Sequence, residues 1–233
     1  MGTVAPAKLG MLMLDSRFPR IPGDAGNPDT WPFPVEIAVV KGATPQEIVC
    51  ADNRAFVDAF VEAGQMLVAS GCAGIATTCG FLTVLRPQLT AALGVPVAAS
   101  ALEQAAQIHA TLAPDRQVGV LTISKNSLSS AHLEAAGVPA GTTVFGLEGS
   151  HFARSILGNQ TTLDVACAGR EMVQAAKNLV HQAPDTGAIL LECTNMVPYA
   201  ADISHATGLP VFSIYTYLCW FYGSLAPKVF PPA

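Results

Sequence analysis

Charged side chains are scarce in this 233-residue chain: Asp, Glu, Lys and Arg make up 12% of it, against about 25% in typical domains. The 12 Lys and Arg are scattered and the formal net charge is −5, so no basic face is available for phosphates. We therefore expect no nucleic-acid partner. With 51% hydrophobic residues, the composition also predicts extensive buried strands and a homodimer or higher homo-oligomer.

Long apolar runs are also missing. No run approaches the ~20 residues that a membrane-spanning helix needs, because Gly, Pro or Thr interrupts the longest ones. The first ten residues, MGTVAPAKLG, lack the basic and then apolar pattern of a secretory signal. We predict no membrane association and a cytoplasmic location.

The common metal and nucleotide motifs are absent as well. The six cysteines form no CxxC pair, the five histidines form no HxxxH pair, and there is no GxGxxG or Walker-type loop. We therefore expect neither a metal site nor a cofactor.

What the chain does contain is an alternation of short apolar runs with Ala-rich segments at helical spacing. The expected strands are residues 9–14, 75–78, 95–98, 118–123, 143–147, 188–192 and 211–213. The expected helices lie within 44–67 and over 82–93, 101–112, 128–136, 163–182 and 197–206. This alternation predicts an α/β fold with mainly parallel sheets flanked by helices.

Residues 17–34 interrupt that rhythm with five prolines, which discourage helix. A loop of this length inside a compact domain is more often functional than idle. We expect it to form a lid or a wall of the site.

The chain also repeats itself. Gly-Val-Pro-Val and Gly-Leu-Pro-Val begin 15 residues after Cys79 and Cys193, and LGML at 9–12 resembles VGVL at 118–121. These matches, in the same order, predict two pseudo-symmetric lobes, one of residues 1–100 plus 214–233 and one of 101–213. Each lobe then carries a cysteine at the carboxyl end of a strand, so the active site is expected in the interlobe cleft.

Each of these two cysteines lies between an expected strand and an expected helix. Helix amino termini favour a thiolate and can hold a carboxylate, so Cys79 and Cys193 are our candidate catalytic residues. One thiolate can remove a proton from a small acid while the other thiol returns a proton to the opposite face. The alternative is that both cysteines are ordinary buried core residues.

Three motifs carry a resemblance to a known family: Leu14-Asp15-Ser16, Thr77-Thr78-Cys79-Gly80-Phe81 and Glu192-Cys193-Thr194-Asn195. They are similar to motifs of the aspartate/glutamate/hydantoin racemase superfamily, and the resemblance covers essentially the whole chain. It implies two lobes, no cofactor, and two cysteines as acid and base. It also implies that Asp15 and Ser16 meet the substrate's amino group and that Thr194 helps to bind its carboxylate.

The chain departs from the glutamate racemases at three places. They have Asn-Thr where this chain has Gly80-Phe81, and His where it has Asn195. They also have a glycine-rich turn after the Asp-Ser pair, where this chain has Arg17-Phe18-Pro19-Arg20. These departures disfavour glutamate as the substrate. The superfamily also includes hydantoin racemases, maleate cis-trans isomerases and arylmalonate decarboxylases, and the decarboxylases keep only one of the two cysteines.

Further candidates for substrate binding come from their positions. Arg17 and Arg20 can clamp a distal carboxylate, and Ser124 follows its strand where Asp15 follows the corresponding one. Donors to the substrate carboxylate or to an enolate are expected from the residues that flank the cysteines: Thr78, Gly80, Thr194 and Asn195. Strand alternation predicts that Glu192 points away from the site.

Together these features predict a cofactor-independent racemase or epimerase that acts on an amino acid or related small carboxylic acid. A maleate-type isomerase or a hydantoin racemase is the alternative within the superfamily. A small-acid-binding protein is the non-enzyme alternative.

Overall fold

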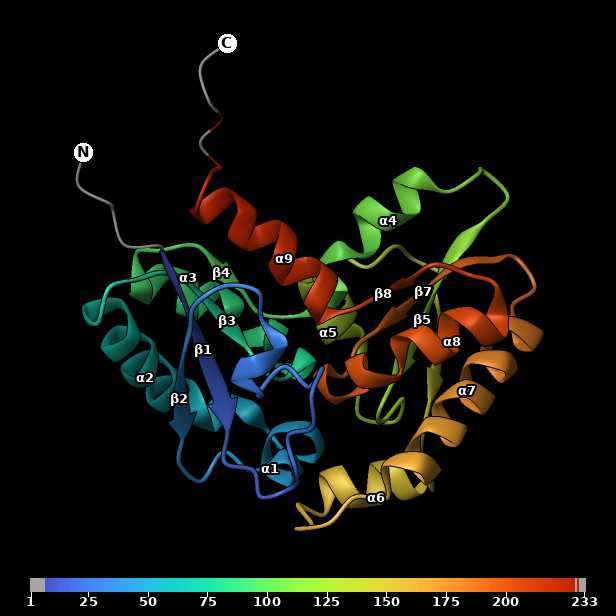
Figure 1. The fold of residues 1–233 in the computed structure, drawn as a ribbon, viewed down its shortest axis with the longest axis horizontal. Helices are drawn as coiled ribbons and strands as arrows, with labels where there is room; N and C mark the ends of the chain where they lie inside the picture. The colour runs from blue at the N-terminus through green and yellow to red at the C-terminus, as the bar shows by residue number, and fades with distance from the viewer. Residues whose placement is uncertain (1–6, 229, 231–233) are drawn as a thin grey trace.

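Two four-stranded parallel sheets form the centre of the protein, as Figure 1 shows for the computed structural model, which describes residues 7–228 and 230. The strand order is β2-β1-β3-β4 in one sheet and β6-β5-β7-β8 in the other. The first sheet contains β1 (Lys8–Leu14), β2 (Val35–Val40), β3 (Cys72–Thr77) and β4 (Val97–Ala98). The second contains β5 (Gln117–Thr122), β6 (Thr143–Gly146), β7 (Thr186–Leu191) and β8 (Val211–Phe212).

Helices flank both sheets, and the last one, α9, lies between the two halves and contacts both β3 and β8 (Figure 1). The α-helices are α1 (Pro45–Cys50), α2 (Val57–Ala69), α3 (Arg86–Leu93), α4 (Ala105–Thr111), α5 (Ser130–Ala135), α6 (His151–Leu157), α7 (Val165–Gln182), α8 (Ala200–Thr207) and α9 (Ile214–Leu225). The 3-10 helices are η1 (Pro28–Thr30), η2 (Asn53–Phe56), η3 (Gly80–Leu85), η4 (Ala101–Gln104) and η5 (Thr194–Tyr199).

The repeat seen in the sequence is a repeat of structure. Gly10 pairs with Ile75 in the first sheet as Gly119 pairs with Ile189 in the second. Both glycines allow a helix to pack closely: a Cβ on Gly10 would lie 3.1 Å from Leu67 of α2, and one on Gly119 would lie 2.9 Å from Leu179 of α7. The predicted α/β fold with two pseudo-symmetric lobes is confirmed. The lobe boundaries near residues 100 and 214 stay a proposal, because α9 packs on both sheets.

Four elements were not expected from the sequence: β2, α6, α9 and the three-residue 3-10 helix η1 inside the proline-rich loop. β2 follows directly on the proline-rich loop and pairs in parallel with β1. The expected helices at 82–93 and 101–112 each begin as a 3-10 helix, η3 and η4, before the α-helix. These tight first turns matter because η3 and its counterpart η5 start immediately after the two cysteines.

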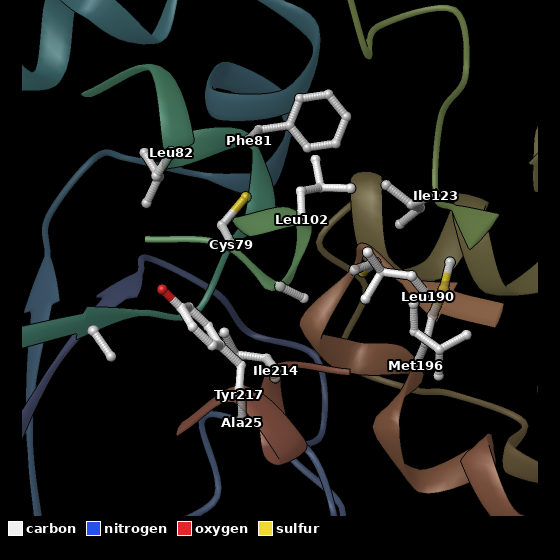
Figure 2. Packing of buried hydrophobic residues seen from close by; sticks show 14 of the residues in the cluster. Ala25, Cys79, Phe81, Leu82, Leu102, Ile123, Leu190, Met196, Ile214 and Tyr217 are labelled. Carbon is white, nitrogen blue, oxygen red and sulfur yellow. The ribbon is translucent and has the colours of Figure 1, made fainter. Parts of the chain in front are cut away.

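One continuous hydrophobic core runs through both halves. Figure 2 shows part of it, with Cys79, Phe81 and Leu82 from the first half and Ile123, Leu190 and Met196 from the second. Within the described residues, no helix combines the length and apolar character needed to cross a bilayer.

Candidate active site

Both cysteines line one small cavity between the lobes. Its free space is about 20 Å³, room for about one water molecule. Side chains of α1 and α6, which contact each other, close it on one side. The lining residues are Leu14, Phe18, Arg20, Pro45, Val49, Thr78, Cys79, Gly80, Phe81, Ile123, Ile156, Leu157, Glu192, Cys193, Thr194 and Asn195.

Cys79 occupies the extended residue between β3 and η3 and is 8% exposed. Burial, and after it the charge of Glu192, raise the pKa of its thiol to about 12. The backbone N–H groups of Phe81 and Leu82 and the charge of Arg20 act in the opposite direction. In this closed site the Cys79 sulfur is therefore a thiol that needs a further favourable charge to ionise.

Cys193 lies at the same point between β7 and η5 and is 7% exposed. Its Sγ donates to Oδ1 of Asn195 over 3.5 Å. Burial raises the pKa of this thiol well above its ordinary value, and Glu192 raises it further, while the N–H of Asn195 lowers it. The expectation that helix amino termini alone would favour thiolates is corrected: burial and a neighbouring carboxylate outweigh the short 3-10 turns.

That carboxylate belongs to Glu192, which was expected to point away from the site. It is 1% exposed and lines the cavity. Its Oε2 accepts a hydrogen bond from Thr122 Oγ1 at 2.8 Å, and burial raises its pKa to about 7. The expectation failed because β7 ends at Leu191, so strand alternation does not govern the direction of the next side chain.

The proline-rich loop forms one wall of the cavity through Phe18 and Arg20. A hydrogen-bond chain ties this loop to the second cysteine. The Arg20 guanidinium pairs with Asp24 at 2.9 Å, and Asn195 Nδ2 donates to the other Asp24 oxygen at 2.5 Å. Asp24 is 2% exposed, and sequence reasoning missed it because a single Asp among glycines and prolines reads as a turn residue.

The structure thus brings seven of the predicted site residues to one cavity. They are Arg20, Thr78, Cys79, Gly80, Cys193, Thr194 and Asn195. Thr194 also joins the lobes, because its Oγ1 donates to the carbonyl of Thr78 at 2.6 Å.

Four predicted residues do not line this cavity. Asp15 accepts from the backbone N–H of Gly42 at 2.9 Å, and the Ser16 hydroxyl accepts from Arg20 at 2.7 Å. The Arg17 side chain is exposed, and Ser124 Oγ donates to Ser127 Oγ at 3.0 Å. Of these four residues, Ser16 is linked to the cavity through its hydrogen bond with Arg20.

Among the residues that the structure describes, no group of three or more His, Cys, Asp or Glu side chains is placed so that it could hold a metal ion. The chemistry available from the cavity itself is proton transfer between sulfur, carboxylate and a bound molecule.

The family model described as Asp/Glu/Hydantoin racemase matches residues 43–221, and the chain belongs to this family. Its fold resembles that of an arylmalonate decarboxylase (TM-score 0.65, 17% identity, covering 96% of this chain and 94% of the other). It also resembles the allantoin racemase of Pseudomonas fluorescens (TM-score 0.61, 18% identity, covering 97% and 99%).

Two curated relatives carry the same name, dimethylsulfoniopropionate lyase. The protein from Durusdinium sp. clade D is 28% identical over 215 residues, which is 88% of this chain and 71% of that protein. Lyase 3 from Emiliania huxleyi is 29% identical over 220 residues, 89% of this chain and 57% of that protein. The chain thus spans little more than half the length of the second relative.

Proposed function

We propose that this protein is a cofactor-independent enzyme that removes the proton α to the carboxylate of a small zwitterionic acid. The first reaction we assign to it is elimination from a β-sulfonium acid such as dimethylsulfoniopropionate. The observation that carries the proposal is the cavity in which two thiols meet a buried carboxylate, one of whose oxygens makes no hydrogen bond within the described residues. The names of the curated relatives support the choice of a sulfonium substrate.

The proposed reaction needs one base. A thiolate sulfur takes the α-proton, the C–H electron pair becomes the Cα=Cβ double bond, and the Cβ–S bond breaks with its pair on sulfur. The products are dimethyl sulfide and acrylate, and the proton then passes from the thiol to water. We assign the base to Cys79, because two backbone N–H groups and Arg20 favour its thiolate, whereas a single backbone N–H favours that of Cys193. The substrate's cation supplies the remaining favourable charge.

A cavity of about 20 Å³ cannot hold such a substrate. We therefore expect α1 and α6 to separate on binding, since their side chains Pro45, Val49, Ile156 and Leu157 close the cavity.

Racemisation or epimerisation of an amino acid is the second candidate, and the equivalent placement of two thiols favours it. In that reaction Cys193 would return a proton to the face opposite Cys79.

We also propose a homodimer or higher homo-oligomer, to be checked by light scattering on the purified protein.

The deciding experiment offers dimethylsulfoniopropionate and a panel of single-enantiomer amino acids and hydantoins to the purified protein in heavy water. We expect equal amounts of dimethyl sulfide and acrylate, measured by gas and liquid chromatography, with activity retained after dialysis against a chelator. Inversion with deuterium at the stereocentre would instead establish the racemase. Turnover that survives unchanged in a Cys79→Ser variant would contradict both candidates.

A further inference from the structure

The residues that precede the two cysteines occupy equivalent places in the two lobes but differ in chemistry. Thr78 and Glu192 are 2% and 1% exposed, and both line the cavity. The backbone N–H of Thr78 donates to the carbonyl of Leu12 in β1 at 3.0 Å. The backbone N–H of Glu192 donates to the carbonyl of Leu121 in the equivalent strand β5 at 2.8 Å. One position thus offers a hydroxyl donor and the other a carboxylate acceptor.

Each of these side chains keeps one polar atom without a partner. Within the described residues, Thr78 Oγ1 and Glu192 Oε1 are buried and make no hydrogen bond. An unpaired buried polar atom costs free energy, so proteins seldom keep one without a use. A third such atom, Arg20 Nε, belongs to another residue that lines the cavity. A hydroxyl donor at Thr78 and a carboxylate acceptor at Glu192 are suited to the two ends of a zwitterion.

The backbone after the first cysteine leaves room for the carboxylate. A Cβ on Gly80 would lie 2.2 Å from Glu192 Oε1 and 2.8 Å from the Glu192 carbonyl oxygen. Any side chain at residue 80 would therefore displace Glu192. The glycine that distinguishes this chain from glutamate racemases is thus matched to the glutamate of the other lobe.

The charges around the cavity do not balance. Arg20 is already paired with Asp24, and burial holds both thiols in the neutral form. Within the described part of the chain, Glu192 forms no ion pair. A buried carboxylate without a counter-ion is costly, and a ligand that brings a cation removes that cost.

From these contacts we infer that Glu192 is the counter-charge for an onium group, a sulfonium or quaternary ammonium, and that the Thr78 hydroxyl donates to the carboxylate of the same molecule. The two equivalent positions then decide which end of a zwitterion faces which lobe. The inference rests on the proposed function for its substrate class, because it assumes a small acid bound between the thiols.

The test compares two ligands of equal shape: 3-(trimethylammonio)propanoate, a zwitterion whose amine is a poorer leaving group than a sulfide, and 4,4-dimethylpentanoate, which lacks the cation. Calorimetry should show that the wild type binds the zwitterion on the order of tenfold more tightly, and that Glu192→Gln loses this preference. Thr78→Val should lower the affinity for both ligands and leave the ratio of their dissociation constants unchanged, because both ligands carry the carboxylate. Unchanged binding of 4,4-dimethylpentanoate by Glu192→Gln shows that this variant is folded.

The preference should also follow the ionisation of Glu192. The titratable or charged groups around it are Cys79, Cys193, Arg20 and Asp24. Burial raises the pKa of both thiols, so they stay neutral near pH 7, and Arg20 forms an ion pair with Asp24. The preference should therefore rise from pH 6 to pH 8 in the wild type, around the pKa of about 7 of Glu192, and stay flat in Glu192→Gln.

Equal binding of the two ligands by the wild type, or an undiminished preference in Glu192→Gln, would overturn the inference. So would Thr78→Val binding both ligands as tightly as the wild type does. Failure of the wild type to release dimethyl sulfide counts against the proposed function alone, since these binding measurements require no reaction.

Discussion

The two strand-to-helix turns that carry the cysteines occupy equivalent places in the fold and have different side chains. β3 and β7 hold the same place in their sheets, and each leads through two residues, the second a cysteine, into a six-residue 3-10 helix. Around this shared frame the first turn reads Thr78-Cys79-Gly80 and the second reads Glu192-Cys193-Thr194. The backbone symmetry places two thiols at one cavity, and the side-chain asymmetry gives the two sides different chemistry.

The asymmetry extends to the sulfur atoms. Cys79 faces two backbone N–H groups and is favoured as a thiolate by Arg20. Cys193 faces one backbone N–H, donates to Asn195, and is disfavoured as a thiolate by Asp24. The two equivalent positions therefore differ in ease of ionisation: more groups favour the thiolate at Cys79 than at Cys193.

The largest expected effect comes from removing each thiol in turn. Cys79→Ser should lower turnover by about 10²–10⁴-fold, because a serine hydroxyl is a much poorer base than a thiolate. If the reaction is an elimination, Cys193→Ser should lower turnover far less than Cys79→Ser does. If it is an inversion, the two variants should lose turnover to the same extent. Initial rates of both variants on the same substrate measure this. Equal elimination by the two variants would remove the distinction between the lobes.

A methyl group at Gly80 should have the next largest effect. Gly80→Ala forces Glu192 aside, since its Cβ would lie 2.2 Å from Oε1. We expect kcat/KM to fall on the order of 10- to 100-fold, the usual result of a small misplacement at a site. The control is Gly223→Ala in α9, where a Cβ meets nothing within 4 Å and activity should be unchanged. Full activity of Gly80→Ala would mean that the Glu192 position is unimportant.

Glu192 should also make the stability of the protein depend on pH, an effect that Thr78 in the equivalent position cannot produce. Burial raises its pKa from 4.5 to about 7, so the folded state holds the proton more tightly than the unfolded state. The free energy of unfolding should therefore fall as pH rises from 4.5 to 7, by on the order of 1–3 kcal/mol.

Urea unfolding of wild type and Glu192→Gln across that range tests this expectation. The variant should lack this loss and be the more stable protein at pH 8. Parallel pH profiles of the two proteins would show that Glu192 ionises normally.

The smallest effect is expected at the hydrogen bond that joins the lobes. Thr194→Val removes the donor to the Thr78 carbonyl, which should lower the free energy of unfolding by about 1 kcal/mol. Thr194→Ser keeps the hydroxyl and serves as the control. If denaturant unfolding gives the valine variant the same free energy of unfolding as the wild type, this hydrogen bond does not stabilise the protein.

Much of the fold could be predicted from the sequence because its signals are local. Apolar runs and helical spacing marked most strands and helices, and the repeat indicated two equivalent lobes. β2 and α6 escaped because each is short and adjoins loop-like segments. In the site, both cysteines and their flanking Thr78, Gly80, Thr194 and Asn195 were recognised, since they lie beside the strand ends.

What only the tertiary structure decided is how distant segments meet. The sequence by itself determined that two lobes each present a cysteine after a strand, because strand periodicity and the repeat are properties of neighbouring residues. The direction of Glu192 depends on the turn into η5 and on the space left by Gly80, 112 positions away. Asp24 joins the site only because its loop folds onto Asn195. Burial then reverses the expected ease of thiol ionisation, since desolvation depends on everything packed around a group.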